Sequence, residues 1–357
     1  MKRRQVISRR ELLGSAGVWS VGTAMGTAAG MGLFASRSEA RPQVLVGSGE
    51  HTYRCTHDWL QPPPDLLWGD THGVAQDAAG RIYVAHTVHP DSPKKDAIVV
   101  FDRNGKFLTS WGERFAGGAH GLDIRREGAT EYLYHCDTRA RLVVKTTLDG
   151  TVVWERGVPE EAGVYKDGGP YIPTNVAFGP VGELFVADGY GSNWIHQYDL
   201  NGNWVRTFGG TGTEPGKVRQ PHGIWLDNRP SRTRSSEPLL VVADRANRRL
   251  QYFSLDGKPV GIAQEGMRQP CHFHLRQDLM LVPDLDSIVT LLDADNRVVA
   301  ALGDGKPTAL RGKPRSEFLP GKFIHPHSAK FLQDGSILVV EWVPIGRVTR
   351  LERVRSG

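Results

Sequence analysis

Three histidines of this 357-residue chain stand in matching sequence contexts and could together hold a metal ion. His120 and His222 are each followed by glycine, and His222 and His327 each follow proline. Neutral imidazole is a good ligand for zinc and similar divalent ions, and three protein ligands leave a position open for water or substrate. A lone histidine is more often hydrogen-bonded to backbone or water. It is the matched set of three that predicts a site for Zn²⁺ or a similar divalent metal.

The histidines belong to a sequence motif that recurs six times. Each copy opens with a short apolar strand, continues into a second strand that ends in an acidic or polar residue, and closes with a third strand ending in Asp-x-x-Gly or a similar turn. Equivalent first-strand positions lie 48 to 56 residues apart, which is enough for one four-stranded blade. These positions are His72, His120, Thr174, His222, Cys271 and His327.

Six such repeats predict an all-β fold, a six-bladed β-propeller over residues 41–357. In this fold the first strand of each blade faces the central channel, so the six equivalent side chains form a ring. Alternate blades lie about 120° apart, which is the arrangement that three ligands around one ion require. Residues 44–55 precede the first repeat and are expected to close the ring by adding an outer strand to the sixth blade.

The first 40 residues read as an export signal. Ser8-Arg9-Arg10-Glu11-Leu12-Leu13 is a twin-arginine motif, and a mild apolar stretch follows it as far as Phe34. Small residues at Ser38 and Ala40 predict cleavage after Ala40. The alternative is an uncleaved anchor, but the many glycines make the stretch a poor membrane span. We therefore expect a protein exported by the twin-arginine route to the periplasm, with no stable membrane insertion after cleavage.

The net charge argues against a nucleic-acid-binding protein, and the cysteine content argues against a disulfide-rich one. The formal net charge is +5, of which +4 lies in residues 1–40, so the mature chain lacks the basic footprint of a nucleic-acid-binding protein. Cys55, Cys136 and Cys271 are too few and too far apart for a disulfide scaffold. One pair could form in an oxidising compartment, but three single buried cysteines are the favoured interpretation. The sequence does not indicate an oligomeric state.

The mature chain resembles the NHL-repeat propellers over nearly its whole length. The segments 186–193 (VADGYGSN), 204–210 (WVRTFGG) and 242–250 (VADRANRRL) are typical of that group. Within it, the spacing of the three channel histidines is similar to that of the peptidyl-α-hydroxyglycine α-amidating lyases. That resemblance implies a zinc-dependent lyase acting on a small-molecule or peptide substrate at the channel mouth.

The resemblance also implies roles for individual residues. His120, His222 and His327 fall at the family's zinc positions, Tyr190 matches its catalytic tyrosine, and Arg245 matches a substrate-side arginine. The implied reaction cleaves a carbinolamide into an amide and an α-oxo acid such as glyoxylate. The metal would act as a Lewis acid on the hydroxyl. Tyr190, its pKa lowered by the cation, would take a proton, and Arg245 would hold a carboxylate.

Two positions depart from the family pattern. Thr87 stands where the family has a second arginine, which bears on the substrate. Ser328 stands where the family has an acidic ligand for a structural calcium, which argues against a Ca²⁺ site, although the carbonyls of Val74 and Leu122 could still line that part of the channel.

Other functions remain open from the sequence. The loss of an arginine at Thr87 favours a non-catalytic periplasmic NHL propeller that binds a peptide, glycan or protein partner, with Tyr190 as an aromatic residue of the rim. A calcium-dependent lactonase is a weaker alternative, because calcium takes oxygen ligands and this ring is rich in imidazole.

Overall fold

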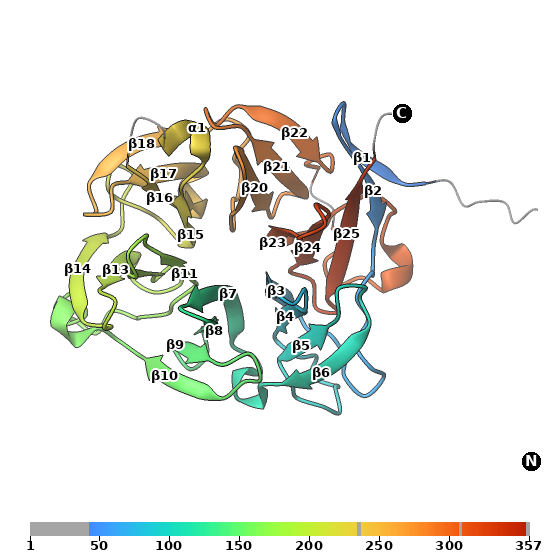
Figure 1. The fold of residues 1–357 in the computed structure, drawn as a ribbon, viewed down its shortest axis with the longest axis horizontal. Coiled ribbons are helices and arrows are strands. Elements are labelled where there is room, and N and C mark those ends of the chain that lie inside the picture. Colours follow the sequence, from blue (N-terminus) through green and yellow to red (C-terminus); the bar gives the residue numbers. More distant parts are fainter. Residues whose placement is uncertain (1–42, 234–236, 307–308, 355–357) are drawn as a thin grey trace, which may run out of the picture. The chain divides into compact units, whose positions relative to one another are not determined.

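Short antiparallel β-strands make up nearly all the regular structure. The computed structural model describes residues 43–233, 237–306 and 309–354, so the predicted signal peptide, residues 1–40, lies outside the described part. Five sheets have four strands and one has five. They are arranged around a common axis (Figure 1), which confirms the all-β class and the six-bladed β-propeller. The helical elements are short: α1 (Pro230–Thr233), η1 (Glu113–Phe115), η2 (Glu160–Ala162), η3 (Arg245–Asn247) and η4 (Arg315–Glu317).

Each blade follows one repeat, and its first strand lies nearest the axis. Blade one contains β3 (Thr71–Gln76), β4 (Ile82–His86), β5 (Ile98–Phe101) and β6 (Phe107–Trp111). Blade two contains β7 (Ala119–Glu127), β8 (Thr130–Asp137), β9 (Leu142–Thr146) and β10 (Val152–Arg156). Blade three contains β11 (Asn175–Phe178), β12 (Leu184–Ala187), β13 (Trp194–Tyr198) and β14 (Trp204–Gly209).

The remaining blades continue the same order. Blade four contains β15 (Pro221–Asp227), β16 (Leu239–Asp244), β17 (Arg249–Phe253) and β18 (Pro259–Ala263). Blade five contains β19 (His274–Arg276), β20 (Leu279–Asp284), β21 (Ile288–Leu292) and β22 (Val298–Leu302). Blade six contains β23 (Pro326–Phe331), β24 (Ile337–Glu341) and β25 (Arg347–Arg353), and then β2 (His51–Thr56) and β1 (Leu45–Ser48) from the other end of the described chain.

The ring closes through the sixth blade, as the sequence predicts. Strand β2 pairs antiparallel with β25, with Tyr53 opposite Arg353 and Cys55 opposite Leu351. Strand β1 then pairs with β2 and adds an outermost fifth strand. Because residues from both ends of the propeller share one sheet, the ring is held closed by a ladder of backbone hydrogen bonds rather than by a covalent link.

The hydrophobic core is divided into six clusters, one between each pair of neighbouring blades. Blades five and six, for example, pack Leu281 and Leu291 against Val339. Alternate residues of a strand point to opposite faces, so each blade contributes one face to each of two clusters. Among the described residues no helix is both long and apolar enough to cross a membrane.

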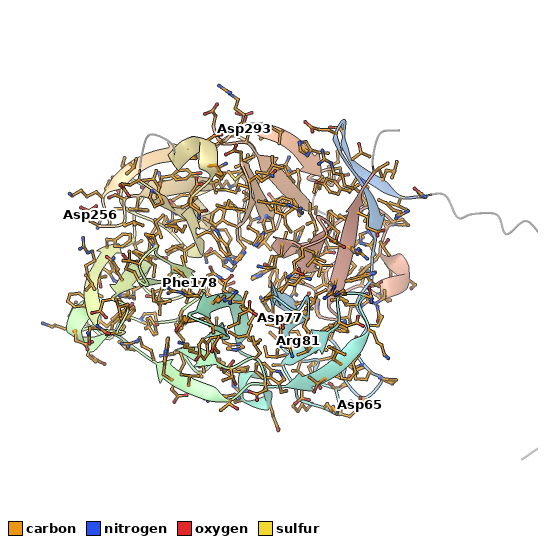
Figure 2. The ribbon with its side chains drawn as sticks, in the orientation of Figure 1. Asp65, Asp77, Arg81, Phe178, Asp256 and Asp293 are labelled. Atoms are coloured by element: carbon orange, nitrogen blue, oxygen red, sulfur yellow. The ribbon has the colours of Figure 1, made fainter. Side chains whose placement is uncertain are left out.

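The aspartates that end the third strands lie on outer turns, away from the axis. Figure 2 labels two of them, Asp256 and Asp293. Asp293 accepts hydrogen bonds from the backbone N–H groups of Asp295 and Arg297, each at 2.9 Å. This side-chain cap explains the aspartate at Asp293. In blade four Ser254 takes the capping position and accepts the backbone N–H of Lys258 at 3.2 Å, while Asp256 accepts the hydroxyl of Ser254.

Candidate metal centre

Four inner strands contain a β-bulge at the point where they come closest to the axis. A bulge places one extra residue opposite the partner strand and changes the direction in which its side chain points. The pairing shifts between Thr71 and Gly73 in β3, between Ala119 and Leu122 in β7, between Pro221 and Ile224 in β15, and between Pro326 and Ser328 in β23. The bulged segments contain His72, His120, His222 and His327.

Glycine after the histidine allows the next blade to approach closely. A Cβ atom on Gly121 would lie 2.5 Å from the carbonyl oxygen of Thr174, and one on Gly223 would lie 2.4 Å from that of Cys271. Both distances are far inside van der Waals contact. The His-Gly pairs of the sequence therefore serve two purposes, a side chain for the centre and a backbone that the neighbouring strand can touch.

That close approach orients the three predicted ligands. Each donates its Nδ1–H to the backbone carbonyl of the equivalent position in the following blade: His120 to Thr174 at 2.8 Å, His222 to Cys271 at 2.8 Å and His327 to His72 at 2.9 Å. A carbonyl can only accept, so Nδ1 carries the proton in each ring. Nε2 is then left with its lone pair free, which is the form that binds a metal.

The structure brings His120, His222 and His327 together. Their ring centroids form a triangle whose three sides are each 4.7 Å. The Nε2 atoms of His120 and His222 are 3.1 Å apart. Two nitrogens bound to one zinc ion at ~2.0–2.1 Å in tetrahedral geometry would be about 3.3 Å apart. The spacing therefore fits a shared ion, and two facing lone pairs at this distance repel unless a cation lies between them.

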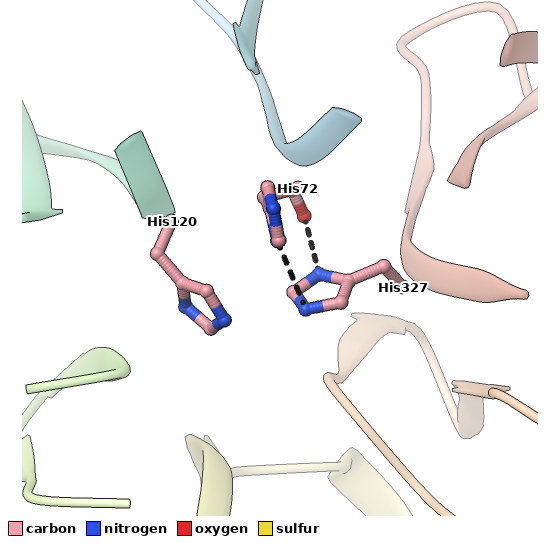
Figure 3. Close-up of side chains that lie close together, drawn as sticks. All are labelled: His72, His120 and His327. Carbon is pink, nitrogen blue, oxygen red and sulfur yellow. Dashed lines mark hydrogen bonds between the residues drawn. The ribbon is translucent and has the colours of Figure 1, made fainter. Parts of the chain in front are cut away.

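His72 joins the cluster, although the sequence did not single it out as a ligand. Its Nδ1 lies 3.2 Å from Nε2 of His327, and its ring centroid is 4.8 Å from that of His120. The ligand atoms of these three residues all lie within 4.8 Å of one another. Figure 3 shows the three side chains converging from separate strands. The sequence signals for His72 were its position in the ring of six and the glycine that follows it, as at His120 and His222.

The centre is buried and electrically neutral before any ion binds. Burial lowers the pKa of His120 to about 3 and lowers the pKa values of His72, His222 and His327 well below the ordinary value, because a charged imidazole would lose its hydration. A small cavity of about 10 Å³ lies among these rings. Its lining has no carboxylate: His72, Gly73, His120, Gly121, Leu122, Thr174, Asn175, His222, His272 and His327.

Tyr190 and Arg245 lie beside the predicted ligands. The hydroxyl of Tyr190 is 3.2 Å from Nε2 of His120 and 3.0 Å from Nε2 of His222, so it bridges the two rings. The Arg245 guanidinium lies 5.3 Å from the centroid of the Tyr190 ring. Burial raises the pKa of Tyr190, and the positive charge of Arg245 opposes that rise. The phenol is therefore protonated before an ion binds.

A second arginine near Thr87, which the sequence did not indicate, is Arg311 in the loop between β22 and β23. Arg311 stacks on Trp342 with its guanidinium carbon 3.8 Å from the ring centroid, and its Nη2 lies 2.8 Å from a carboxylate oxygen of Asp70. The backbone N–H of Asp70 donates to the hydroxyl of Thr87 at 3.0 Å. Arg311 thus brings a guanidinium near Thr87, although from a loop that has no counterpart in the repeat.

Neighbouring residues have structural partners. His325 bonds through Nδ1 to the carbonyl of Leu285 at 2.7 Å and packs on Trp342, so it is His327 that faces the cluster. Ser328 is buried and offers no carboxylate to a calcium ion. Cys55, Cys136 and Cys271 are all free and buried. Cys271 occupies the equivalent ring position in blade five, where its sulfur lies 3.9 Å from Nη1 of Arg245.

Comparison with known proteins gives distant relatives. No family model matches the chain. It is 26% identical over 260 residues to peptidyl-alpha-hydroxyglycine alpha-amidating lyase 2 of Drosophila melanogaster, covering 69% of this chain and 57% of that protein. It is 31% identical over 170 residues to peptidyl-glycine alpha-amidating monooxygenase B of Xenopus laevis, covering 45% and 18%. It is 28% identical over 202 residues to NHL repeat-containing protein 3 of Mus musculus, covering 54% of each. The chain thus spans less than two thirds of the length of these relatives.

Solved structures agree on the fold. A streptogramin B lyase superposes with a TM-score of 0.52 at 12% identity, covering 84% of this chain and 97% of that one. The virginiamycin B lyase of Staphylococcus aureus gives a TM-score of 0.51 at 11% identity, covering 85% and 100%. At such identities the likeness concerns the fold alone. The chain is a six-bladed β-propeller that resembles, at low identity, the peptidyl-alpha-hydroxyglycine alpha-amidating lyases and the NHL repeat-containing proteins.

Proposed function

We propose that the protein is a metal-dependent lyase that cleaves a carbinolamide, acting in the periplasm after export by the twin-arginine signal in residues 1–40. One observation carries the proposal. Three imidazoles from alternate blades have Nδ1–H committed to backbone carbonyls and turn Nε2 toward a common point, where the Tyr190 hydroxyl also lies. Zn²⁺ or a similar divalent ion suits such a set of neutral nitrogen donors.

The side chains suit the cleavage of a compound R–CO–NH–CH(OH)–COO⁻. When bound, the divalent ion supplies Lewis acidity at the substrate hydroxyl and positive charge beside Tyr190. Tyr190, as its phenolate, takes the hydroxyl proton. The C–N bond then breaks, its electron pair goes to nitrogen, and Tyr190 returns the proton there. The products are a primary amide and glyoxylate, and the enzyme ends as it began.

The substrate carboxylate would be held by Arg245. Its guanidinium is buried beside Tyr190, so an anion there would be paired in a largely dry site, where a charge-assisted hydrogen bond is strong. The lining of the centre has no carboxylate, so a divalent ion would keep its full charge and favour an anionic substrate. Both features support a small anionic molecule or the end of a peptide as the substrate.

The test is turnover of a peptide ending in α-hydroxyglycine by the zinc-loaded protein. We expect release of glyoxylate and the shortened amide. Tyr190→Phe should keep its metal and lose at least about 100-fold in kcat, since a positioned acid–base group contributes 10²–10⁴-fold. His222→Ala should lose metal. Tyr134→Phe is the control, because the hydroxyl of this tyrosine bonds to Glu127, at the opposite end of strand β7 from His120, and its loss should leave kcat unchanged.

A loaded wild-type protein that releases no glyoxylate would overturn the lyase assignment. Turnover that is equal in Tyr190→Phe and the wild type would overturn the role of the tyrosine. In the first case the propeller would be a binding module of the NHL type with a metal inside it. That alternative is favoured by Thr87 in place of the expected arginine.

A further inference from the structure

We propose that His72 is a fourth ligand of the centre, so that the metal is held by four imidazoles from blades one, two, four and six. The inference rests on the proposed binding of a metal at this centre. It does not depend on the lyase reaction. Three ligands on alternate blades would include none from blade one. The side chain of His72, from blade one, nevertheless lies in the same cluster.

The first observation is the local backbone. His72 lies in a β-bulge of the inner strand, as do the three other histidines. In blade three the regular pairing begins at Asn175, directly after Thr174, and runs without a shift. In blade five Pro270 pairs with Asp284 and His274 with Leu281, so the pairing also shifts by one residue across Cys271. The bulge is therefore not confined to histidine positions. It gives His72 the same local backbone as the three predicted ligands, and a bulge re-aims a side chain.

The second observation is the distance. Nδ1 of His72 and Nε2 of His327 are 3.2 Å apart, and the two rings are nearly perpendicular at 86°. The nitrogens of His120 and His222 are 3.1 Å apart. Both separations match the edge of about 3.3 Å expected between nitrogens of a tetrahedral site with bonds of ~2.0–2.1 Å. His72 thus meets the same distance criterion as the predicted ligands.

The third observation concerns hydrogen bonding. Nδ1 of His327 already donates to the carbonyl of His72, so its Nε2 has only a lone pair to offer. In the ion-free protein Nδ1–H of His72 donates to that lone pair. An ion would replace this proton and use both nitrogens at once, and His72 would change tautomer to bind through Nδ1. His72 is 7% exposed, so bulk water does not compete for the nitrogen.

A four-nitrogen set has a chemical consequence. Catalytic zinc sites keep a position open for substrate, whereas sites with four protein ligands are closed. Here a substrate oxygen would have to enter as a fifth ligand or displace His72. Because no carboxylate lines the cavity, all four donors are neutral, and donors of this kind also suit copper, iron and nickel.

The test uses the full chain loaded with Zn²⁺ or with Co²⁺ alone, and reads coordination rather than turnover. X-ray absorption of the zinc form should give four nitrogen ligands in the wild type and three nitrogens plus one oxygen in His72→Ala. Metal affinity should fall at least about tenfold in the variant, and the Co²⁺ absorption spectrum should change. Cys271→Ser is the matched control at another ring position, and it should bind and absorb as the wild type does.

His72→Thr is the second variant, since threonine stands at the equivalent position of blade three and keeps the fold testable if the alanine variant does not fold. Three nitrogens in the wild type, or equal affinity in wild type and both His72 variants, would overturn the proposal while leaving the lyase assignment intact. Four nitrogen ligands around the zinc without release of glyoxylate would support this proposal and overturn the lyase assignment. A protein that binds neither ion would overturn both.

Discussion

The amine of Lys330 lies deep in the propeller and meets a histidine. Its Nζ is 3.0 Å from Nε2 of His274, and Nδ1 of the same ring accepts the backbone N–H of Phe331 at 3.2 Å. A neutral imidazole has one N–H, which must then be on Nε2, so the ring donates to Lys330 and the amine must be uncharged to accept. Burial lowers the pKa of Lys330, although the negative charge of Asp123 opposes it, which agrees with a neutral amine.

Lys330 should therefore make stability depend on pH. The unfolded chain holds this proton below the ordinary lysine pKa near 10.4, whereas the folded chain holds it less, so unfolding takes up a proton and stability rises with pH in that window. Lys330→Met should be more stable than the wild type at pH 7. It should also lose a slope of up to about 1.4 kcal/mol per pH unit over the window between the lowered pKa of the folded state and about 10. Urea unfolding across that range measures both effects.

Lys258→Met is the control for replacing a lysine by methionine at an exposed position, and it should not raise stability at pH 7 as Lys330→Met does. A Lys330→Met variant that is less stable at pH 7 and keeps the wild-type slope would contradict a neutral amine.

At the level of single residues, the sequence could predict which residues lie near the axis but not the direction in which their side chains point. Repeat register identified His120, His222 and His327 and preferred His327 to His325, because equivalent residues of a propeller face the axis. It placed His72 in the same ring without indicating that its side chain turns to His327. Side-chain direction there depends on a bulge, which is a property of strand pairing. Arg311 could not be found at all, because it lies in a loop outside the repeat.

At the level of the strand, the repeat predicted most of the fold because each copy makes one sheet. The spacing of 48 to 56 residues and the turn aspartates identified blades, and residues 44–55 were expected to join the sixth. The structure extends that expectation with a complete hairpin, β1 and β2. Its inner strand alternates buried and exposed residues, with His51, Tyr53 and Cys55 buried. Such alternation is what allows one face to pack on the core while the other meets solvent.

Tyr53 should be the residue of this hairpin on which ring closure depends. It is 2% exposed and packs in the cluster between blades five and six. Tyr53→Ala should cost about 3–5 kcal/mol of unfolding free energy, as for other large buried aromatic side chains. Leu45→Ala in the neighbouring strand, at a side chain that is 52% exposed, should cost no more than about 0.5 kcal/mol. Equal losses in the two variants, measured by urea unfolding, would show that β2 does not close the ring.

At the level of the whole molecule, the metal centre and the fold share the same strands. The inner strands of blades one, two, four and six each bring one histidine to the axis. Each blade otherwise touches mainly its two neighbours through its hydrophobic clusters, while opposite blades meet only near the axis. An ion held there would link blade one to blade four across the ring, which neither the β2–β25 ladder nor the clusters between neighbours do.

Metal binding should therefore stabilise the entire propeller. A ligand that binds only the folded state adds RT ln(1 + [L]/Kd), or about 4.1 kcal/mol at a thousand times Kd. We expect Zn²⁺ to raise the Tm of the protein and a chelator to lower it, with the shift growing with the logarithm of free metal. His120→Ala should abolish the shift, since it removes a ligand at the centre of the cluster. His325→Ala should retain it, because this ring bonds to Leu285 and stands outside the cluster. A Tm that is the same in zinc and in chelator would mean that the four histidines do not hold an ion, and the coupling between centre and fold would be lost with it.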